Sequence, residues 1–203
     1  MNRYKKKIFA QGEEACSFSK CGFDNVIKEF VRFKKLMDKI GETFFLCGAT
    51  CLGLVRNGKL IEHDKDIDVG VLGEEALYRI KEKLSKHYDQ SHIVGAENGK
   101  ILWFKNIIGE GILPIEIAAQ YTKDDCLFYN RDMGKSWIWK KGRCVWPKRL
   151  FNKFEKIKFQ GLAFDVPSPV EEFLTLFYGW NWRMPDHYKD WRYHCHNLFE
   201  GWL

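Results

Sequence analysis

The clearest pattern in the chain is an apolar stripe between Asp24 and Lys39, in which hydrophobic side chains recur every three or four positions. This spacing predicts an amphipathic helix that Asp24 can cap and that Gly41 can end. The apolar segment TFFLC that follows predicts a short buried strand. The next segment, GATCLGLVRNGK, is small and glycine-rich, which predicts a turn leading into a short helix.

An alternating pattern begins directly afterwards, in DIDVGVL. Ile67, Val69 and Val71 fall on one face of the predicted strand, and Asp66 and Asp68 fall on the other, because strand side chains alternate. The strand is therefore predicted to have an apolar face and an acidic face.

The rest of the chain predicts further elements of both kinds. Residues 74–86 have a helical pattern, and ILPIEIAAQY reads as a strand that alternates around Glu116. Asn98-Gly99 predicts a hairpin with a type I′ turn, and a second hairpin should turn at Gln160-Gly161. Residues 123–147 are polar, aromatic and irregular, which predicts loops or insertions. In SPVEEFLTLFYG, Ser168 is the expected N-cap of a helix that ends at Gly179.

These elements predict a mixed α/β chain with one continuous core and no linker. We expect a single domain over residues 1–203, with its core at about residues 24–185 and a C-terminal extension of helices and loops. The order of strand, glycine turn, D-x-D on the next strand and a lone acid on a later strand is that of the nucleotidyltransferase fold.

Composition narrows the class of protein. The 203 residues carry a formal net charge of +6, which suits an anionic small-molecule substrate and does not require nucleic acid. Seven cysteines, an odd number without tight pairing, predict reduced thiols. The basic N-terminus has too short an apolar run for a secretory signal, and no stretch reaches the roughly 18 apolar residues of a membrane span. We therefore expect a soluble, cytoplasmic protein.

The acidic face is the strongest chemical signal. Asp66 and Asp68 point to one side of a strand, roughly 7 Å apart along it, and repel each other unless a cation lies between them. Glu116 is a charge on an otherwise apolar strand and needs a partner if it is buried. Oxygen ligands of this kind favour Mg²⁺ (or Mn²⁺), so a metal shared by Asp66, Asp68 and Glu116 is predicted.

The segment before the acids supplies groups that suit a phosphate. Backbone N–H groups of a glycine-rich turn at a helix start can hold phosphate oxygens, here around Gly48 and Thr50. Arg56 adds a planar guanidinium fork. The alternative is a turn that needs small residues, with Arg56 on the surface.

The stretch GATCLGLVRNGKLIEHDKDIDVGV resembles the signature of the LicD and fukutin-related phosphotransferases. The residues that fall on the pattern are Gly48, Leu52, Gly53, Arg56, Asp64, Asp66, Asp68 and Gly70; position 49 is Ala where that family usually has Thr. LPIEIAAQY resembles the second acidic strand of the family, with Glu116 in place of the usual Asp. The segment from residue 154 to Gly179 is similar to its hairpin, Val-Pro turn and Tyr-Gly helix end.

The resemblance implies transfer of a phospho-alcohol, such as phosphocholine or ribitol phosphate, from a CDP-activated donor to a glycan hydroxyl. It implies that Asp66 and Asp68 bind Mg²⁺, that Glu116 completes the site, and that Asp64 is an added ligand. It further implies that Arg56 steadies the donor diphosphate.

Other residues carry weaker signals. Cys16, Cys21, Cys47 and Cys51 lack the paired spacing of a zinc site, and the last two are expected near the active turn. The aromatic C-terminal segment can line the substrate pocket or cap the core, and Tyr178, Arg183 and His187 are its candidates for substrate contact.

Three other functions remain open. A nucleotidyltransferase that moves NMP from an NTP would share the same acids. A sugar transferase with a D-x-D motif usually has a longer N-terminal half than the roughly 60 residues present here. A degenerate binding module is disfavoured by the intact acids.

Overall fold

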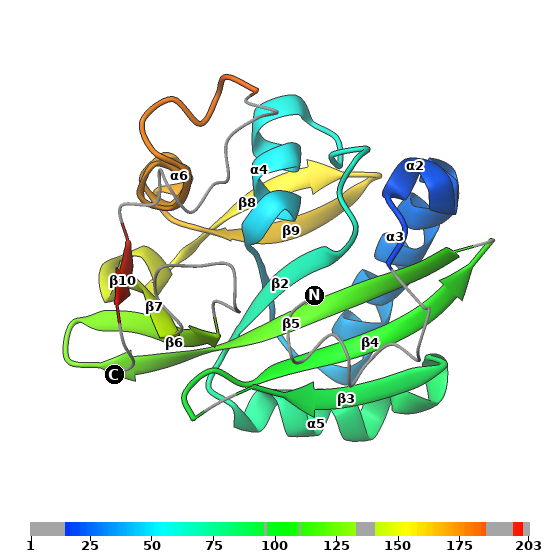
Figure 1. Cartoon of the computed structure of the whole chain (residues 1–203), viewed down its shortest axis with the longest axis horizontal. Helices are drawn as coiled ribbons and strands as arrows, with labels where there is room; N and C mark the ends of the chain where they lie inside the picture. The colour runs from blue at the N-terminus through cyan, green and yellow to red at the C-terminus, as the bar shows by residue number, and fades with distance from the viewer. Residues whose placement is uncertain (1–14, 96, 110, 133–140, 186–196, 201–203) are drawn as a thin grey trace.

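The long strand β5 (Gly111–Lys123) organises a mixed sheet (Figure 1). Its first part pairs with β4 (Ile101–Ile108) and its end with β6 (Cys126–Asp132), both antiparallel. Its middle pairs in parallel with β2 (Ile67–Leu72). The computed structural model describes residues 15–95, 97–109, 111–132, 141–185 and 197–200.

Within these residues the sheet has the strand order β10-β7-β6-β5-β2-β1-β9-β8, and β3 extends it beyond β4. The remaining strands are β1 (Phe45–Leu46), β3 (Gln90–Val94), β7 (Lys141–Pro147), β8 (Phe154–Phe159), β9 (Leu162–Pro167) and β10 (Leu198–Glu200). In this part of the chain the parallel strand pairs are β2 with β5 and β1 with β9, and an isolated bridge between Ala15 and Ile112 is also parallel. The mixed α/β class predicted from the sequence is confirmed.

Helices lie on both sides of the sheet. Figure 1 shows α3 (Phe23–Ile40) and α5 (Glu75–Leu84) behind it and α4 (Gly48–Asn57) in front of β8 and β9. The shorter elements are α2 (Phe18–Cys21), α6 (Val170–Tyr178) and the 3-10 turns η1 (Ser85–His87) and η2 (Lys148–Phe151).

The apolar face of β2 points into the core behind the sheet. Ile67, Val69 and Val71 are buried there, as their alternation predicted. Phe30 of α3 stacks on Phe164 of β9 with ring centroids 4.7 Å apart, so aromatic packing contributes to the contact between α3 and the sheet. Gly41 ends α3 in the left-handed conformation, as expected, but Gly22 rather than Asp24 is its N-cap.

Residues 123–147 were predicted as loops, and this was wrong. They contain the antiparallel strands β6 and β7, with Tyr129 paired to Cys144 and Leu127 to Trp146. Polar residues interrupt the apolar alternation here, so the strands are held by tertiary packing of Leu127, Tyr129 and Trp146 rather than marked by local pattern.

The predicted turns have mixed outcomes. Gln160 and Gly161 both have positive φ (49° and 75°), as a type I′ turn between β8 and β9 requires. The β3–β4 hairpin is confirmed, but its connection spans residues 95–100, and only Asn98 of the Asn-Gly pair is left-handed. The N-cap of α6 is Pro169, while the Ser168 hydroxyl donates a hydrogen bond to Glu155 instead.

No helix in the described ranges combines the length and the apolar character that a bilayer crossing requires.

Candidate active site

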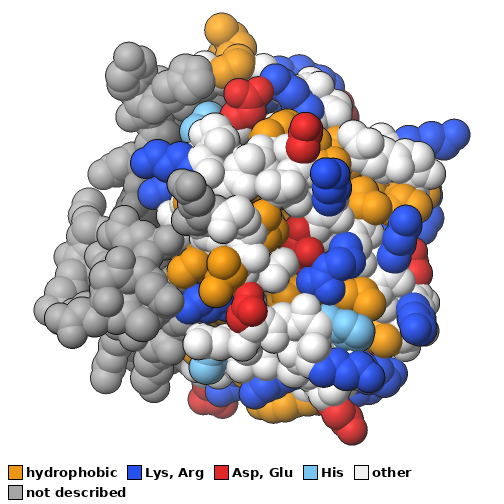
Figure 2. Space-filling model, turned by 90° about the vertical axis from the view of Figure 1, so that its right-hand side faces the viewer, with side chains coloured by type: hydrophobic (Ala, Val, Ile, Leu, Met, Phe, Trp, Pro, Cys, Tyr) orange, Lys and Arg blue, Asp and Glu red, His pale blue; other side chains and the backbone are white. Residues whose placement is uncertain are grey.

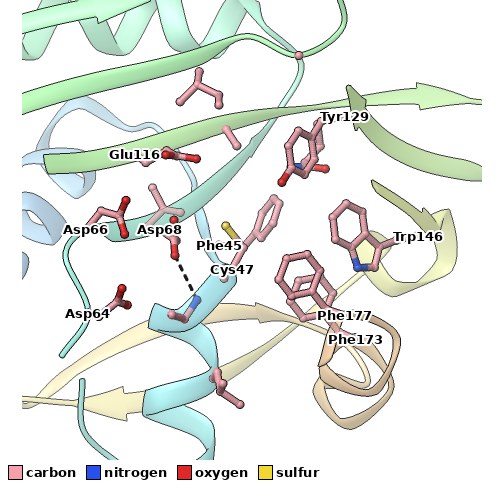
Figure 3. Close-up of a pocket in the computed structure, with 18 of the residues that line it drawn as sticks. Phe45, Cys47, Asp64, Asp66, Asp68, Glu116, Tyr129, Trp146, Phe173 and Phe177 are labelled. Atoms are coloured by element: carbon pink, nitrogen blue, oxygen red, sulfur yellow. Dashed lines mark hydrogen bonds between the residues drawn. The ribbon is translucent and has the colours of Figure 1, made fainter. Parts of the chain in front are cut away.

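A cavity of about 370 Å³ opens between the start of α4, the acidic face of β2 and the pocket-facing side of β5 (Figure 3). One end is lined by Asp64, Asp66, Asp68 and Glu116. The other end is lined by aromatic side chains of β1, β6, β7, η2 and α6. The cavity therefore joins an anionic compartment to an aromatic one.

The three aspartates form a compact group. One carboxylate oxygen from each of Asp64, Asp66 and Asp68 lies within 4.8 Å of those of the other two. Asp66 and Asp68 share a face because they flank Ile67, which is buried on the opposite side of β2. Asp64 joins them from the connection that precedes the strand.

Asp68 is held at the N-terminus of α4. Its Oδ2 accepts a hydrogen bond from the backbone N–H of Ala49 at 3.1 Å. Its own N–H donates to the hydroxyl of Thr50 at 2.8 Å, and its carbonyl accepts from the N–H of Cys47 at 3.4 Å. Both the backbone and the carboxylate of Asp68 are thus fixed by three successive contacts to residues at the start of one helix.

Gly48 is required by this arrangement for two reasons. It has φ of 53°, which L side chains rarely adopt, and a Cβ there would lie 2.3 Å from Oδ2 of Asp68. A side chain at position 48 would therefore displace the carboxylate.

Asp64 is anchored by the N-terminal part of the chain. The N–H of Phe18 donates to the carbonyl of Asp64 at 2.8 Å, and the N–H of Ser19 donates to that of Glu62 at 3.0 Å. These donors lie inside a loop closed by a disulfide between Cys16 and Cys21, whose Cα atoms are 6.1 Å apart. The expectation that the cysteines are all free thiols is therefore wrong for this pair, which the sequence spacing did not reveal.

Glu116 faces the same end of the cavity from β5. It pairs with Asp68 in the parallel register of β2 and β5, and Figure 3 shows the two side chains next to each other. Glu116 is not a member of the compact three-aspartate group. Its side chain extends the acidic wall.

Tyr178, a predicted substrate contact, lies at the end of α6 and lines the cavity. Burial raises the pKa of its hydroxyl well above the usual value, and the neighbouring negative charges of Asp68 and Asp64 raise it further. The hydroxyl therefore stays protonated and is a hydrogen-bond donor at the edge of the acidic compartment.

The aromatic end is built around Trp146 of β7. Its ring lies nearly parallel to those of Tyr129, Phe173 and Phe177, at centroid distances of 6.0, 5.7 and 5.9 Å. Figure 3 shows these rings gathered on the side of the cavity away from the aspartates.

Phe45 of β1 lies between the two compartments (Figure 3). It pairs with Gly70 of β2, where a Cβ would lie 2.3 Å from the Phe45 ring. The glycine thus makes room for this ring at the cavity floor.

Comparison with known proteins decides the family. The profile described as "LicD/FKTN/FKRP, nucleotidyltransferase domain" matches residues 41–169, which include the three aspartates, Glu116 and most of the cavity wall. The chain belongs to the LicD/FKTN/FKRP family. It is therefore a transferase domain.

Three similar relatives carry one name. The chain is 26% identical to ribitol-5-phosphate transferase FKTN of Homo sapiens over 202 residues, covering 94% of this chain and 41% of the relative. The same values hold for the Macaca fascicularis protein. For the Mus musculus protein the identity is 23% over 169 residues, covering 78% of this chain and 33% of the relative. The chain thus spans about two-fifths or less of the length of these relatives.

The residues of the LicD/FKTN/FKRP domain fit a divalent cation. Three carboxylates offer only oxygen ligands, which hard cations such as Mg²⁺ prefer. Because one oxygen from each carboxylate already lies within 4.8 Å of the other two, modest side-chain rotations would bring all three onto one ion. Asp64, Asp66 and Asp68 are the residues that would hold it.

Several predicted site residues lie elsewhere. Thr50 is fully buried behind Asp68, where its hydroxyl accepts the Asp68 N–H, so it positions an acid rather than facing the cavity. Arg56 is at the far end of α4, about 12 Å along the helix from Gly48, and donates to Asn57 and to the carbonyl of Trp182.

Arg183 is exposed, stacks over Trp182 and pairs with Glu171. Neither Arg56 nor Arg183 lines the cavity. Arg56 contacts the segment that follows α6, and Arg183 contacts the first turn of α6. His187 falls outside the described residues.

Sequence reasoning missed the cavity residues Phe45, His63, Gln120, Tyr129, Asn130, Trp146, Phe151, Phe173 and Phe177. A signal existed for Gln120, since Glu116, Ala118 and Gln120 alternate on one face of a strand. A signal also existed for Phe173 and Phe177, which are four residues apart on one helix face. No such signal marks Trp146 or Tyr129, because the irregular pattern of residues 123–147 predicts loops.

Proposed function

We propose that this domain transfers a phospho-alcohol from a CDP-activated donor to a glycan hydroxyl, with Mg²⁺ or Mn²⁺ bound at Asp64, Asp66 and Asp68. The observation that carries the proposal is the three-aspartate group at the N-terminus of α4, in one cavity with an aromatic compartment. The printed name of the relatives, ribitol-5-phosphate transferase, makes ribitol phosphate the first alcohol to test.

The acidic end suits the donor diphosphate only when a cation is present. When bound, the cation neutralises charge on the diphosphate and on the oxygens of the transferred phosphoryl group. The three aspartates hold it, and Ala49 and Thr50 hold Asp68 in place. The N-terminus of α4, which faces the same end, adds a partial positive charge that favours an anionic ligand.

The transfer exchanges one P–O bond for another. The acceptor oxygen bonds to the phosphorus that bears the alcohol, the bond from that phosphorus to the bridging oxygen breaks, and CMP leaves with the bond's electron pair. We assign the proton of the acceptor hydroxyl to the carboxylate of Glu116, because Glu116 lies beside Asp68 yet outside the compact group. This assignment departs from the sequence-based expectation that Glu116 is a metal ligand.

Tyr178 has the complementary role. Its hydroxyl stays protonated, so it donates a hydrogen bond to an oxygen on which negative charge develops. Positioning and charge stabilisation, rather than a covalent intermediate, supply the rate enhancement.

The test is a donor screen with the purified domain. CDP-ribitol, CDP-glycerol and CDP-choline are each incubated with a glycan panel and Mg²⁺ or Mn²⁺, and release of CMP and mass gain of the glycan are measured. ATP and GTP are tested in parallel for pyrophosphate release, with Asp66→Asn as the inactive control. CMP release with glycan modification supports the proposal; turnover of ATP or GTP without turnover of any CDP-alcohol overturns it in favour of NMP transfer.

A further inference from the structure

Two buried polar groups at the aromatic end of the cavity are unsatisfied. Gln120 is 3% exposed and Trp146 is 3% exposed, and both line the cavity. Neither Oε1 of Gln120 nor Nε1 of Trp146 has a hydrogen-bond partner among the residues that the structure describes. A buried polar atom without a partner lowers the stability of the fold, so two in one compartment need a reason.

The two groups belong to one wall, on β5 and β7, with β6 between them. Gln120 precedes Tyr121, which pairs with Phe128, so Gln120 lies next to Tyr129 across the β5–β6 pair. The Tyr129 ring in turn lies nearly parallel to that of Trp146, with an interplanar angle of 13°. An acceptor, a donor and flat apolar faces are thus placed along three neighbouring strands.

We infer that this wall recognises the pyrimidine base of the donor nucleotide, with Gln120 and Trp146 as its specificity-determining residues; the inference rests on the proposed CDP-alcohol donor. A cytosine edge carries an amine donor beside ring and carbonyl acceptors. Oε1 of Gln120 accepts from the amine, and Nε1–H of Trp146 donates to an acceptor of the base. The aromatic rings provide the stacking surface, which every base can use.

Other parts of the donor suit this wall less well. A polyol such as ribitol presents hydroxyl groups along its length, whereas this end of the cavity presents mainly ring carbon atoms. A quaternary ammonium group would suit the rings but would leave both Gln120 and Trp146 unpaired. A base uses the rings and both polar groups together.

Small residues leave room for such a ligand. Ala118 lies between Glu116 and Gln120 on the cavity face of β5, and Gly99 of the β3–β4 connection lies over β6. A Cβ at Gly99 would lie 2.1 Å from the carbonyl oxygen of Asn130, so the connection packs directly on the strand. The wall is therefore built before any ligand binds.

The test uses binding rather than turnover. Affinities of the wild-type domain, Gln120→Leu and Trp146→Phe for CMP and for ribose 5-phosphate are measured by calorimetry with Mg²⁺. Each variant should bind CMP about ten-fold more weakly and ribose 5-phosphate equally well. The matched controls are Gln90→Leu and Trp180→Phe, which make the same changes at exposed positions.

Thermal unfolding separates recognition from a structural role. Because Oε1 of Gln120 is buried without a partner, Gln120→Leu should keep or raise the melting temperature of the ligand-free domain. The same variant should lower the affinity for CMP. The inference is overturned if both variants bind CMP with unchanged affinity. It is also overturned if their affinity for ribose 5-phosphate falls as much as their affinity for CMP. If phosphocholine rather than CMP loses affinity in Trp146→Phe, the wall holds the alcohol and the inference is wrong.

The outcomes also separate this inference from the proposed function. If CMP affinity depends on Gln120 but no CDP-alcohol is turned over, the proposed reaction is rejected and the inference of base recognition is kept. If the domain turns over a CDP-alcohol but CMP affinity does not depend on Gln120, only the inference of base recognition is rejected.

Discussion

Gly48 and Asp68 are packed so closely that a Cβ on Gly48 would lie 2.3 Å from Oδ2 of Asp68. The same oxygen accepts the N–H of Ala49, so the carboxylate has little space to retreat. The glycine at the start of α4 is therefore part of what sets the position of the acid.

Gly48→Ala should lower turnover about 100-fold, because a displacement of about 1 Å in a catalytic group costs that much. Gly58→Ala is the matched control: Gly58 ends the same helix with φ of 66°, and no atom lies within 4 Å of its missing Cβ. Both variants carry the left-handed backbone penalty of about 1 kcal/mol. Steady-state kinetics with the best donor of the screen should show the large loss in Gly48→Ala alone; equal losses would mean that strain, not the carboxylate, is responsible.

Thr50→Val should weaken both the fold and the site. It leaves the partly buried N–H of Asp68 without its acceptor, which should cost about 1 kcal/mol in the free energy of unfolding. It also frees the start of β2, so turnover should fall about ten-fold. Urea denaturation and kinetics check both effects, and Thr50→Ser, which keeps the hydroxyl, should restore them. Wild-type turnover in Thr50→Val would remove Thr50 as a positioning residue.

Opening the disulfide should loosen Asp64. Cys21→Ser removes the link that closes the loop carrying the Phe18 N–H donor, at a cost of about 2 kcal/mol in the free energy of unfolding for a loop of this length. Mn²⁺ affinity should fall with it, as measured by calorimetry on folded protein. Cys126→Ser, at a half-buried free cysteine, is the control and should leave Mn²⁺ affinity unchanged. If Cys21→Ser binds Mn²⁺ as the wild type does, the loop does not support Asp64.

The pair of Glu42 and Arg79 should give a pH-dependent contribution to stability. Hydrogen bonds from Arg79 at 2.7 and 3.0 Å lower the pKa of the Glu42 carboxyl. The unfolded chain then binds more protons than the folded one in acid, so stability is present above about pH 4.3 and is lost as the pH falls through the folded-state pKa.

Because Arg79 is half exposed, water screens the pair, and its contribution at pH 7 should be small. Glu42→Gln should lose it at pH 7 and match the wild type at pH 3, as measured by urea denaturation at both values. A stability difference that does not shrink in acid would show that the ion pair is not its source.

The acidic end of the site could be predicted from the sequence because its information is local. The alternation of Asp66 and Asp68 around Ile67 fixes their common face, and an apolar strand around Glu116 marks it as exceptional. Asp64 was expected beside these acids only from the family resemblance, because its position depends on backbone hydrogen bonds to Phe18, 46 residues earlier in the chain.

The aromatic end could not be predicted for a different reason. Trp146 and Tyr129 meet only because β6 and β7 form a hairpin, and that hairpin lacks a clean alternating pattern. Arg56 shows the opposite case: its position in the motif predicts a phosphate ligand, and the structure places it at the far end of α4, eight residues from Gly48 and outside the cavity lining. Spacing in the sequence places a residue on an element, and only the packing of elements decides what it faces.

The central claim is that Asp64, Asp66 and Asp68 bind one divalent cation in the presence of nucleotide. Calorimetric titration of Mn²⁺ into the CMP-bound wild-type domain and into Asp66→Asn and Asp68→Asn tests it most directly, with Asp124→Asn as a control at an exposed turn. The account predicts one site per chain in the wild type and control, and affinity at least about 100-fold weaker in the two variants with melting temperatures preserved. Mn²⁺ binding of wild-type strength in Asp66→Asn and Asp68→Asn would contradict it.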